Sequence, residues 1–305
     1  MEAVDLGNTG TAVSRLIYGC MRIVGDGGHD ARERGRRAIH AAVDAGYTAF
    51  DHADIYGGGE CERLFGEVLA ESPGLRDQLF VIGKCGIRFA GDPCQDDPKR
   101  YDFSAAHIIN SVDGSLARLG LDHLDLLLLH RPDYLFDPAE VADAFETLQS
   151  SGKVRHVGVS NFSPSQVELL ASAVATPLVA NQVEINLHRI AALEDGTLDQ
   201  CQRLDIMPQA WSPLAGAVFE AWGNTFDAAD AARIAGELAR QSAAYGVAPA
   251  NIALAWLLRH PAGIAPIIGS TSPERIREAV TALDVEYAAT DWYRLLEARN
   301  GREVP

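Results

Sequence analysis

Short apolar runs rich in β-branched residues alternate along the chain with longer segments in which apolar residues recur at helical spacing. The short runs predict eight strands, at residues 16–20, 48–51, 80–84, 124–130, 154–160, 178–182, 206–211 and 264–268. The longer segments predict helices that begin near residues 30 and 164 and helices that span residues 60–70, 104–119, 138–150, 228–245, 249–259 and 273–283. Because no run of strands interrupts this alternation, it predicts crossover connections and a parallel sheet.

Two of the helix starts carry a capping box, in which two polar side chains three residues apart satisfy free backbone N–H groups. Asp30 with Glu33 forms the first, and Ser163 with Gln166, separated by Pro164, forms the second. We therefore expect Asp30 and Ser163 to be the N-cap residues of their helices.

The number of strand and helix units decides the architecture. The strand at residues 124–129 is almost continuously apolar, as is typical when both faces of a sheet are covered. Eight units favour an α/β fold closed as a (β/α)8 TIM barrel over an open sheet. A length of 305 residues also fits two domains, but no linker, low-complexity segment or close repeat divides the chain. We therefore predict a single barrel domain over residues 1–305.

The charge balance excludes some partners. The chain holds 26 basic and 42 acidic side chains, a formal net charge of −16, and 47% of its residues are hydrophobic. Nucleic acids and anionic membrane surfaces are bound through basic patches, so neither is an expected partner. The apolar content is that of a globular protein and not of a disordered acidic chain.

The five cysteines are scattered, with no Cys-x-x-Cys pair and no Cys/His cluster at zinc-binding spacing. We expect reduced thiols and no metal site. Cys20 and Cys85 are expected to be packing residues, since strand alternation directs Cys85 away from Lys84. The first residues show no targeting signal, and no stretch approaches the ~18 apolar residues of a membrane span, so we expect a cytoplasmic protein.

Polar and aromatic residues stand where the predicted strands end. In parallel barrels the active site forms at this edge, because the carboxyl ends of all the strands meet there. Taken singly, such residues also serve as helix caps, solvated strand ends or core side chains, but their convergence on one rim favours a functional site. They are Asp51 with Tyr56 beyond it, Lys84, His130, Ser160, Asn161, Gln182, Trp211, Ser212, Gly269, Ser270 and Thr271.

Four of these residues suit proton transfer. A tyrosine with a pKa near ~10 is a poor acid at neutral pH, and an adjacent ammonium lowers that pKa. We therefore expect Tyr56 to act as a general acid beside Lys84, with Asp51 keeping Lys84 charged and oriented. His130 is expected to hydrogen-bond a substrate oxygen and direct it at Tyr56.

Several motifs, in a fixed order along nearly the whole chain, carry a resemblance to a known family. They are FDHADIYG at residues 50–57, VIGKC at 81–85, LLLLHRP at 126–132, GKVRHVGVSNF at 152–162, NQVE at 181–184, AWSPL at 210–214 and IGSTSPER at 268–275. Through them the sequence resembles the aldo-keto reductases. Residues 51–67 and the cysteine after Lys84 are most similar to a bacterial branch of predicted oxidoreductases in that family.

The resemblance implies a (β/α)8 barrel that uses a nicotinamide cofactor. By resemblance, Tyr56 is the general acid in reduction, Lys84 and Asp51 lower its pKa, and His130 orients the substrate. The nicotinamide carboxamide would be held by Ser160, Asn161 and Gln182, and its ring would stack on Trp211. Further cofactor contacts are implied at Gly19, Cys20, Met21, Ser212, Pro213 and Leu214.

The last motif, at residues 268–275, predicts an anion site from its own residues. Ser272 before Pro273 is typical of an N-cap and a first-turn proline, so free N–H groups and the positive end of a helix dipole favour an anion there. By resemblance this anion is the 2′-phosphate of NADP(H). The family's contacts to the phosphate and the adenine correspond to Gly269, Ser270, Thr271, Arg275 and Glu278.

Two departures from the family pattern bear on cofactor choice. Many members have a lysine where this chain has Gly269 and an asparagine where it has Ala279. A single charge-assisted phosphate contact is worth a few kcal/mol at most. NADP(H) therefore remains the expected cofactor, and NAD(H) is the alternative.

Two predicted connections, residues 86–103 and 213–227, are longer than is usual in a compact domain, and such loops often carry function. Their aromatic residues include Phe89, Tyr101, Phe219 and Trp222. These side chains either form a lid over the substrate or pin the loops to the barrel.

We therefore expect an enzyme that reduces an aldehyde or ketone with NADPH, taking the proton from Tyr56 and acting on a small carbonyl substrate. A redox-sensing or regulatory subunit that binds NADP(H) with little turnover is the alternative from the binding class. A barrel aldolase that forms a Schiff base on Lys84 is a third hypothesis. The neighbouring Asp51 and Tyr56 and the nucleotide motifs disfavour it.

Overall fold

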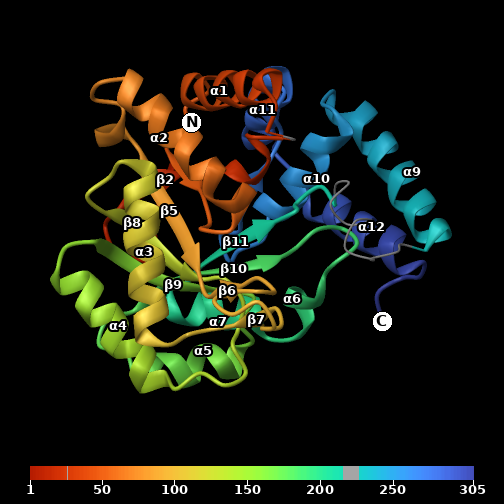
Figure 1. Cartoon of the computed structure of the whole chain (residues 1–305). Coiled ribbons are helices and arrows are strands. Elements are labelled where there is room, and N and C mark those ends of the chain that lie inside the picture. Colours follow the sequence, from red (N-terminus) through yellow and green to blue (C-terminus); the bar gives the residue numbers. More distant parts are fainter. Residues whose placement is uncertain (26, 216–226) are drawn as a thin grey trace.

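The computed structural model describes residues 1–25, 27–215 and 227–305 (Figure 1). At its centre, eight parallel strands close into a barrel, which confirms the predicted fold. In barrel order they are β3 (Ile17–Gly19), β4 (Ala49–Asp51), β5 (Phe80–Cys85), β8 (Leu124–Leu129), β9 (Val154–Ser160), β10 (Leu178–Glu184), β11 (Met207–Trp211) and β12 (Ala265–Ile268). The barrel closes where β12 pairs with β3.

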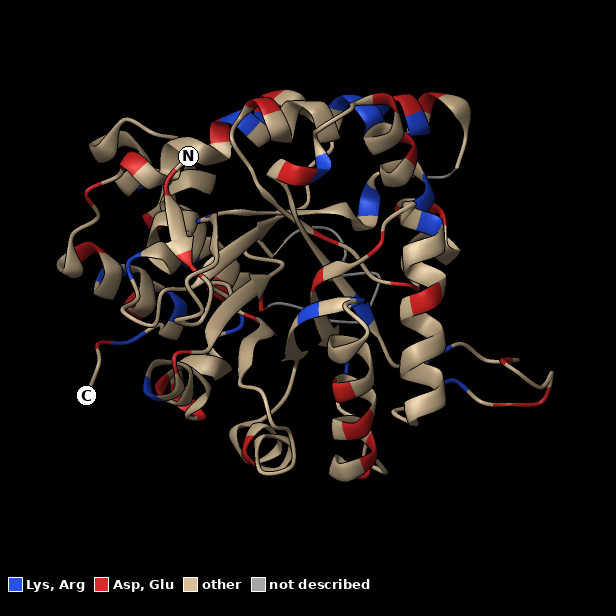
Figure 2. Ribbon diagram, turned by 90° about the vertical axis from the view of Figure 1, so that its left-hand side faces the viewer, with Lys and Arg blue, Asp and Glu red and all other residues tan. Residues whose placement is uncertain are grey.

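Helices surround the barrel (Figure 1). They are α1 (His29–Asp44), α2 (Glu60–Glu71), α3 (Ala105–Leu119), α4 (Pro138–Ser150), α5 (Pro164–Ala171), α6 (Ala191–Glu194), α7 (Thr197–Leu204), α9 (Ala228–Tyr245), α10 (Pro249–Leu258), α11 (Pro273–Val280) and α12 (Ala289–Asn300). The acidic side chains are spread over these outer helices (Figure 2). Within the described ranges, no helix is both long and apolar enough to cross a membrane.

Two hairpins depart from the predicted alternation. β1 (Ala3–Asp5) pairs antiparallel with β2 (Ala12–Ser14) ahead of the barrel, and β6 (Ile87–Arg88) pairs with β7 (Arg100–Tyr101) after β5. The prediction of uninterrupted alternation was wrong here, because strands of two or three residues are too short to show a periodicity. The first hairpin closes the amino-terminal end of the barrel, where Leu6 and Val13 join Ile17 in the interior core.

The helix starts follow the prediction in one case and not in the other. Ser163 caps α5 with both bonds of the capping box to Gln166. The prediction for Asp30 was wrong, because α1 begins at His29 with Gly28 as its N-cap residue. Asp30 instead lies in the first turn, where its charge interacts favourably with the helix dipole.

Strand alternation separates two cores. Leu126 and Leu128 point into the barrel, and Leu127 packs between the barrel and the helices. The same alternation sends the Cys85 side chain into the outer core, as predicted, while Lys84 stays at the carboxyl end of the barrel interior. Burial raises the pKa of the Cys85 thiol well above its usual value, so Cys85 is a neutral packing residue.

Candidate active site

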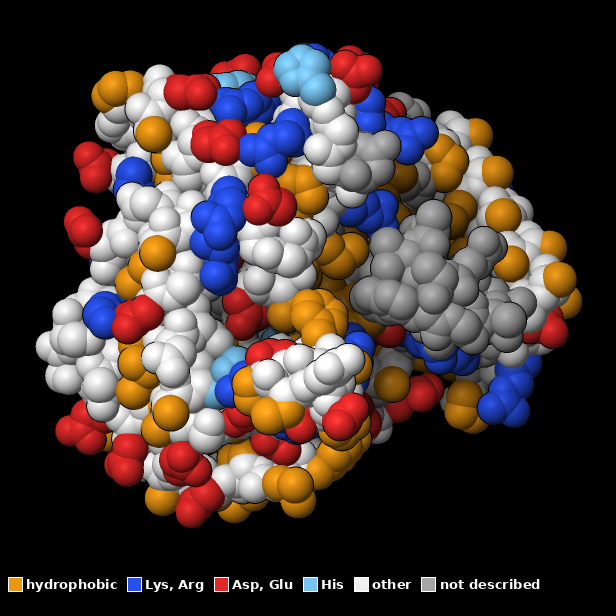
Figure 3. Space-filling model, viewed as in Figure 1, with side chains coloured by type: hydrophobic (Ala, Val, Ile, Leu, Met, Phe, Trp, Pro, Cys, Tyr) orange, Lys and Arg blue, Asp and Glu red, His pale blue; other side chains and the backbone are white. Residues whose placement is uncertain are grey.

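A cavity of ≈ 950 Å³ opens at the carboxyl ends of the barrel strands, where the sequence predicted a site. In Figure 3, hydrophobic and basic side chains meet around a hollow near the middle of the face shown. Most of the predicted site residues line this cavity: Gly19, Met21, Asp51, Tyr56, His130, Ser160, Asn161, Gln182, Trp211, Ser212, Pro213, Leu214, Gly269, Ser270, Arg275 and Glu278.

Three predicted residues do not line the cavity. Lys84 is 1% exposed and lies behind Asp51 and Tyr56, which it contacts. Cys20 is buried in the core between barrel and helices, and Thr271 is half-buried beside the cavity. Neither Cys20 nor Thr271 is among the residues that line the cavity, and their expected cofactor contacts stay predictions.

Lys84 is the centre of a buried hydrogen-bond cluster. Its Nζ donates to both Asp51 carboxylate oxygens at 2.7 Å and to the His52 carbonyl at 2.7 Å. It also lies 3.1 Å from the Tyr56 hydroxyl oxygen. Asp51 ends β4 and Lys84 lies near the end of β5, so the pairing of these neighbouring strands brings the carboxylate and the ammonium together.

The protonation states of this cluster differ in part from the prediction. Burial raises the pKa of Tyr56 to about 12, and Lys84, which lowers it, offsets burial only in part. The expected net lowering was wrong because desolvation of a phenolate outweighs one nearby ammonium. Burial opposes the charge of Lys84, but Asp51 and Tyr56 raise its pKa above the ordinary value. At neutral pH Tyr56 is therefore a phenol and Lys84 an ammonium.

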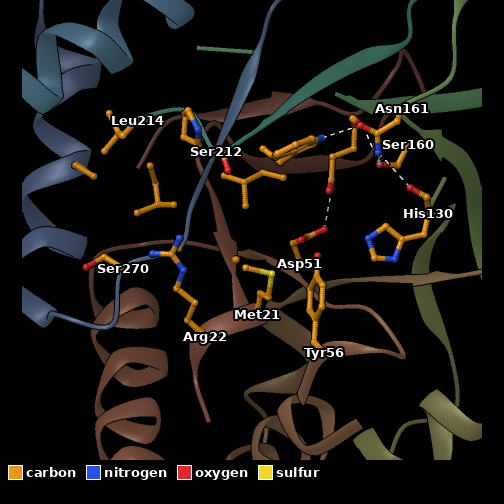
Figure 4. A pocket seen from close by; sticks show the side chains of 18 of the residues that line it. Met21, Arg22, Asp51, Tyr56, His130, Ser160, Asn161, Ser212, Leu214 and Ser270 are labelled. Carbon is orange, nitrogen blue, oxygen red and sulfur yellow. Dashed lines mark hydrogen bonds between the residues drawn. The ribbon is translucent and has the colours of Figure 1, made fainter. Parts of the chain in front are cut away.

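His130 faces Tyr56 across the cavity floor, with the two ring centroids 5.9 Å apart and nearly perpendicular (Figure 4). Its backbone N–H donates to the Cys85 carbonyl at 2.9 Å. Burial, reinforced by the charges of Lys84, Arg131 and Lys99, lowers the pKa of His130 well below its usual value. His130 is therefore a neutral imidazole, which can donate one hydrogen bond and accept another.

An amide network forms the wall beside His130. Asn161 donates through Nδ2 to Ser160 Oγ at 2.8 Å and accepts from Trp211 Nε1 at 2.9 Å (Figure 4). Gln182 Nε2 donates to Asp51 Oδ1 at 2.8 Å. Asn161 has φ 62°, a left-handed conformation that asparagine tolerates better than most residues. These contacts fix the Trp211 ring and the amide groups that the sequence assigned to one subsite.

The opposite end of the cavity lies at the start of α11. Ser272 caps this helix, accepting from the Arg275 N–H, and Pro273 occupies the first turn, as predicted. Arg22, from the 3-10 turn Cys20–Arg22, also lines this cavity. Its side chain lies in the same part of the cavity as Ser270 (Figure 4). A Cβ on Gly269 would meet nothing within 4 Å, so this position is open.

The structure adds residues that the strand-end analysis did not assign to the site. They reach the cavity from turns, the β6–β7 hairpin, the helices and strand β12: Arg22, Ile55, Gly57, Ile87, Lys99, Tyr101, Arg131, Ala250, Asn251, Leu254, Ile267, Ile268 and Ala279. The position of Arg131 directly after His130 was the one sequence signal available for it. Within the predicted loop at 213–227, residues 216–226 lie outside the described residues, so its lid stays a prediction.

The barrel fold and two similar proteins described below, one named a reductase and one an oxidoreductase, together define the class of protein. It is an oxidoreductase built on a TIM barrel. A family model described as the aldo/keto reductase family matches residues 15–300. The chain belongs to this family, which confirms the predicted resemblance.

Three similar proteins illustrate the relationship. The oxidoreductase YdhF of Escherichia coli is 41% identical over 100% of both chains. A 6-dehydroglucose reductase of Agrobacterium fabrum is 42% identical over 96% of both chains. A crystal structure of a thermostable aldo-keto reductase with the inhibitor epalrestat has a TM-score of 0.82 and 25% identity, covering 98% of this chain and 100% of that one.

Proposed function

We propose that this protein reduces an aldehyde or ketone to its alcohol with NADPH. The observation that supports it most directly is the phenol of Tyr56, which lines the cavity, contacts the Lys84 ammonium at 3.1 Å and faces the neutral imidazole of His130. This arrangement supports the action of a proton donor and a second hydrogen-bond donor on one carbonyl oxygen.

The donor set of the cavity fits a nicotinamide dinucleotide. Amide groups and an indole ring stand at the end near His130, where Asn161 and Trp211 are hydrogen-bonded to each other. Two arginines and a helix amino terminus stand at the other end, where Arg22 and Arg275 offer charge to phosphates. Arg275 and Ser270 would hold the 2′-phosphate of NADPH, while Glu278 lies nearby to contact the adenine.

Each residue of the cluster has a separate role in the proposed carbonyl reduction. The cofactor's chemistry, when it is bound, would be transfer of a hydride to the carbonyl carbon. Tyr56 donates its proton to the carbonyl oxygen, and Lys84 stabilises the phenolate that remains. His130 donates a hydrogen bond to the same oxygen and so orients the substrate. Asp51 keeps the buried Lys84 charged, because its carboxylate compensates the desolvation of the ammonium.

The Schiff-base alternative receives no support from the geometry. Lys84 is 1% exposed, its Nζ contacts Asp51, His52 and Tyr56, and its pKa is raised. A Schiff base needs a neutral amine that is accessible to substrate. Lys84 therefore suits electrostatic support of Tyr56.

The test is NADPH and NADH oxidation by the purified protein with a panel of aldehydes, ketones and sugar aldehydes. The last group is included because one relative is named a 6-dehydroglucose reductase. Tyr56→Phe should reduce kcat about 10²- to 10⁴-fold while NADPH binding, followed by fluorescence, changes little. Tyr134→Phe is the matched control, because Tyr134 is 84% exposed and does not line the cavity.

Retained turnover in Tyr56→Phe on every accepted carbonyl would contradict the proposed role of Tyr56. Tight NADPH binding with no oxidation on the whole panel would instead support the regulatory-subunit alternative.

A further inference from the structure

The cavity has a cationic region beyond His130 that the proposed proton transfer does not use. Lys99 and Arg131 both line the cavity, and both act electrostatically on His130. Lys99 comes from the β6–β7 hairpin and Arg131 from the turn after β8, so two separate segments place positive charge at this end.

Lys99 lacks the partner that other cations of its segment have. On the same hairpin, Arg88 pairs with Asp92 and Asp102, and Arg100 pairs with Asp97. Among the chain's three lysines, Lys84 is bound to Asp51 and Lys153 to Asp113. In the described part of the chain, no carboxylate lies within ion-pair distance of Lys99.

Arg131 is held differently. Its guanidinium carbon lies 5.3 Å from the centroid of the Trp211 ring, an arrangement that orients the cation without neutralising it. Glu184 interacts with it electrostatically, and Glu184 also interacts with Arg189 and accepts a hydrogen bond from Asn186. Arg131 lines the cavity and Glu184 does not, so the guanidinium is the charged group of this pair that a bound anion would meet.

Lys99 is exposed and Arg131 is half-buried at the same cavity. Like charges that line one cavity repel each other, and an anion bound between them offsets this repulsion. A protein with a net charge of −16 does not need them for solubility. The neutral imidazole of His130 lies beside them and contributes no charge of either sign.

We propose that Lys99 and Arg131 form a subsite for an anionic group of the substrate, so that the preferred substrate is a carbonyl compound bearing a carboxylate or another oxyanion. The proposal rests on the proposed carbonyl reduction and narrows its substrate class. The oxyanion is held by the two cations while the carbonyl oxygen lies at Tyr56 and His130. No covalent step is added to the reaction.

The experiment compares substrates that differ in charge and little in shape. The pairs are 4-carboxybenzaldehyde with methyl 4-formylbenzoate, and succinic semialdehyde with its methyl ester. The full chain should reduce the acid of at least one pair with a kcat/KM about 10- to 100-fold above that of the ester, mainly through KM, as one or two charge-assisted hydrogen bonds imply. Equal kcat/KM values for acid and ester in both pairs would overturn the subsite and would not contradict the proposed carbonyl reduction.

Variants test the residues themselves. Lys99→Met should lower the acid-to-ester ratio at least about fivefold, and Lys99→Glu should bring it below one, because the substituted carboxylate repels the substrate anion. Lys153→Met is the matched control, since Lys153 pairs with Asp113 outside the cavity, and it should keep the wild-type ratio. An unchanged ratio in both Lys99 variants would contradict the proposal.

A binding measurement separates this inference from the reductase assignment. Titration calorimetry with 4-(hydroxymethyl)benzoate, the alcohol product of the first acid, needs no turnover. The subsite would be supported if the wild-type chain bound this anion more tightly than its methyl ester and Lys99→Met did not. This holds even if no carbonyl compound consumed NADPH. Equal binding of acid and ester to the wild-type chain would overturn the subsite.

Discussion

The Lys84 Nζ lies 3.1 Å from the Tyr56 hydroxyl oxygen, and yet burial raises the pKa of that hydroxyl to about 12. The ammonium therefore does not make Tyr56 an anion. It makes loss of the proton less costly than burial alone would allow. The resting group is a proton donor with a stabilised conjugate base, which suits the reducing direction of the proposed reaction.

This relationship predicts different pH profiles for the reduction and the oxidation directions. With a pKa near 12, Tyr56 stays protonated from pH 6 to 9, so kcat for carbonyl reduction should be nearly flat over that range. Alcohol oxidation needs the phenolate, whose fraction rises about tenfold per pH unit below the pKa, so its rate should rise with pH. Initial rates in both directions provide the measurement. A reduction rate that falls steeply above pH 7 would show that Tyr56 ionises earlier.

Removing the ammonium should harm activity and stability together. In Lys84→Met the Asp51 carboxylate is left buried without its ion pair, so we expect a loss of about 3–5 kcal/mol in the free energy of unfolding. Turnover should fall about 10²-fold or more, since the phenolate of Tyr56 loses its support. The double variant Asp51→Asn/Lys84→Met should recover part of the stability, measured by urea unfolding, and none of the turnover. Recovery of turnover would contradict a direct role for Lys84.

The sequence predicted the barrel well where the local signal was strong. β9 runs from Val154 to Ser160 as predicted, because its apolar residues lie between clear turn signals. α6, α7 and α12 were missed. In α12 the residue fully buried is Leu295, too weak a pattern to mark a helix.

The same division applies to the site. Strand ends predicted Asp51, Lys84 and His130, because parallel barrels bring all strand ends to one rim. Arg22 and Lys99 were not assigned, since turns and hairpins carry no periodicity that fixes where a side chain points. The pKa of Tyr56 depended on the depth of its burial, which spacing along the chain does not contain.

The proposed phosphate contact of Arg275 predicts a change in cofactor choice. Arg275→Met should weaken NADPH binding about 10- to 100-fold and leave NADH binding within about twofold, because the substitution removes charge from the 2′-phosphate site. Arg277→Met is the matched control on the same helix, since Arg277 is exposed and does not line the cavity. Fluorescence titration of both nucleotides provides the measurement. Equal weakening of NADPH and NADH would assign Arg275 to a shared part of the cofactor.

An acidic pair behind the Tyr56 turn, the half-buried Asp54 and the buried Glu62, has a further consequence. Asp54 lies near Glu62, and the Glu62 carboxylate accepts from Arg118 Nε at 2.6 Å. The Asp54 carboxylate accepts from the Ser111 hydroxyl and the Ile55 N–H. Burial, together with the charge of Glu62, raises the pKa of Asp54 to about 7, and the Arg118 charge opposes this rise. One oxygen of each carboxylate, Asp54 Oδ1 and Glu62 Oε1, is buried without a hydrogen-bond partner in the described structure.

The raised pKa of Asp54 predicts that its ionisation destabilises the fold as pH rises. The folded state binds the proton more tightly than the unfolded chain, so this group's effect is absent below about pH 4 and grows through pH 7. Asn at position 54 mimics the protonated acid, so Asp54→Asn should gain stability relative to the wild type by on the order of 1 kcal/mol between pH 5 and pH 8. Urea unfolding at both pH values measures this, with the exposed Asp122→Asn as control. A difference between Asp54→Asn and wild type that is the same at both pH values would show that Asp54 does not titrate in this range.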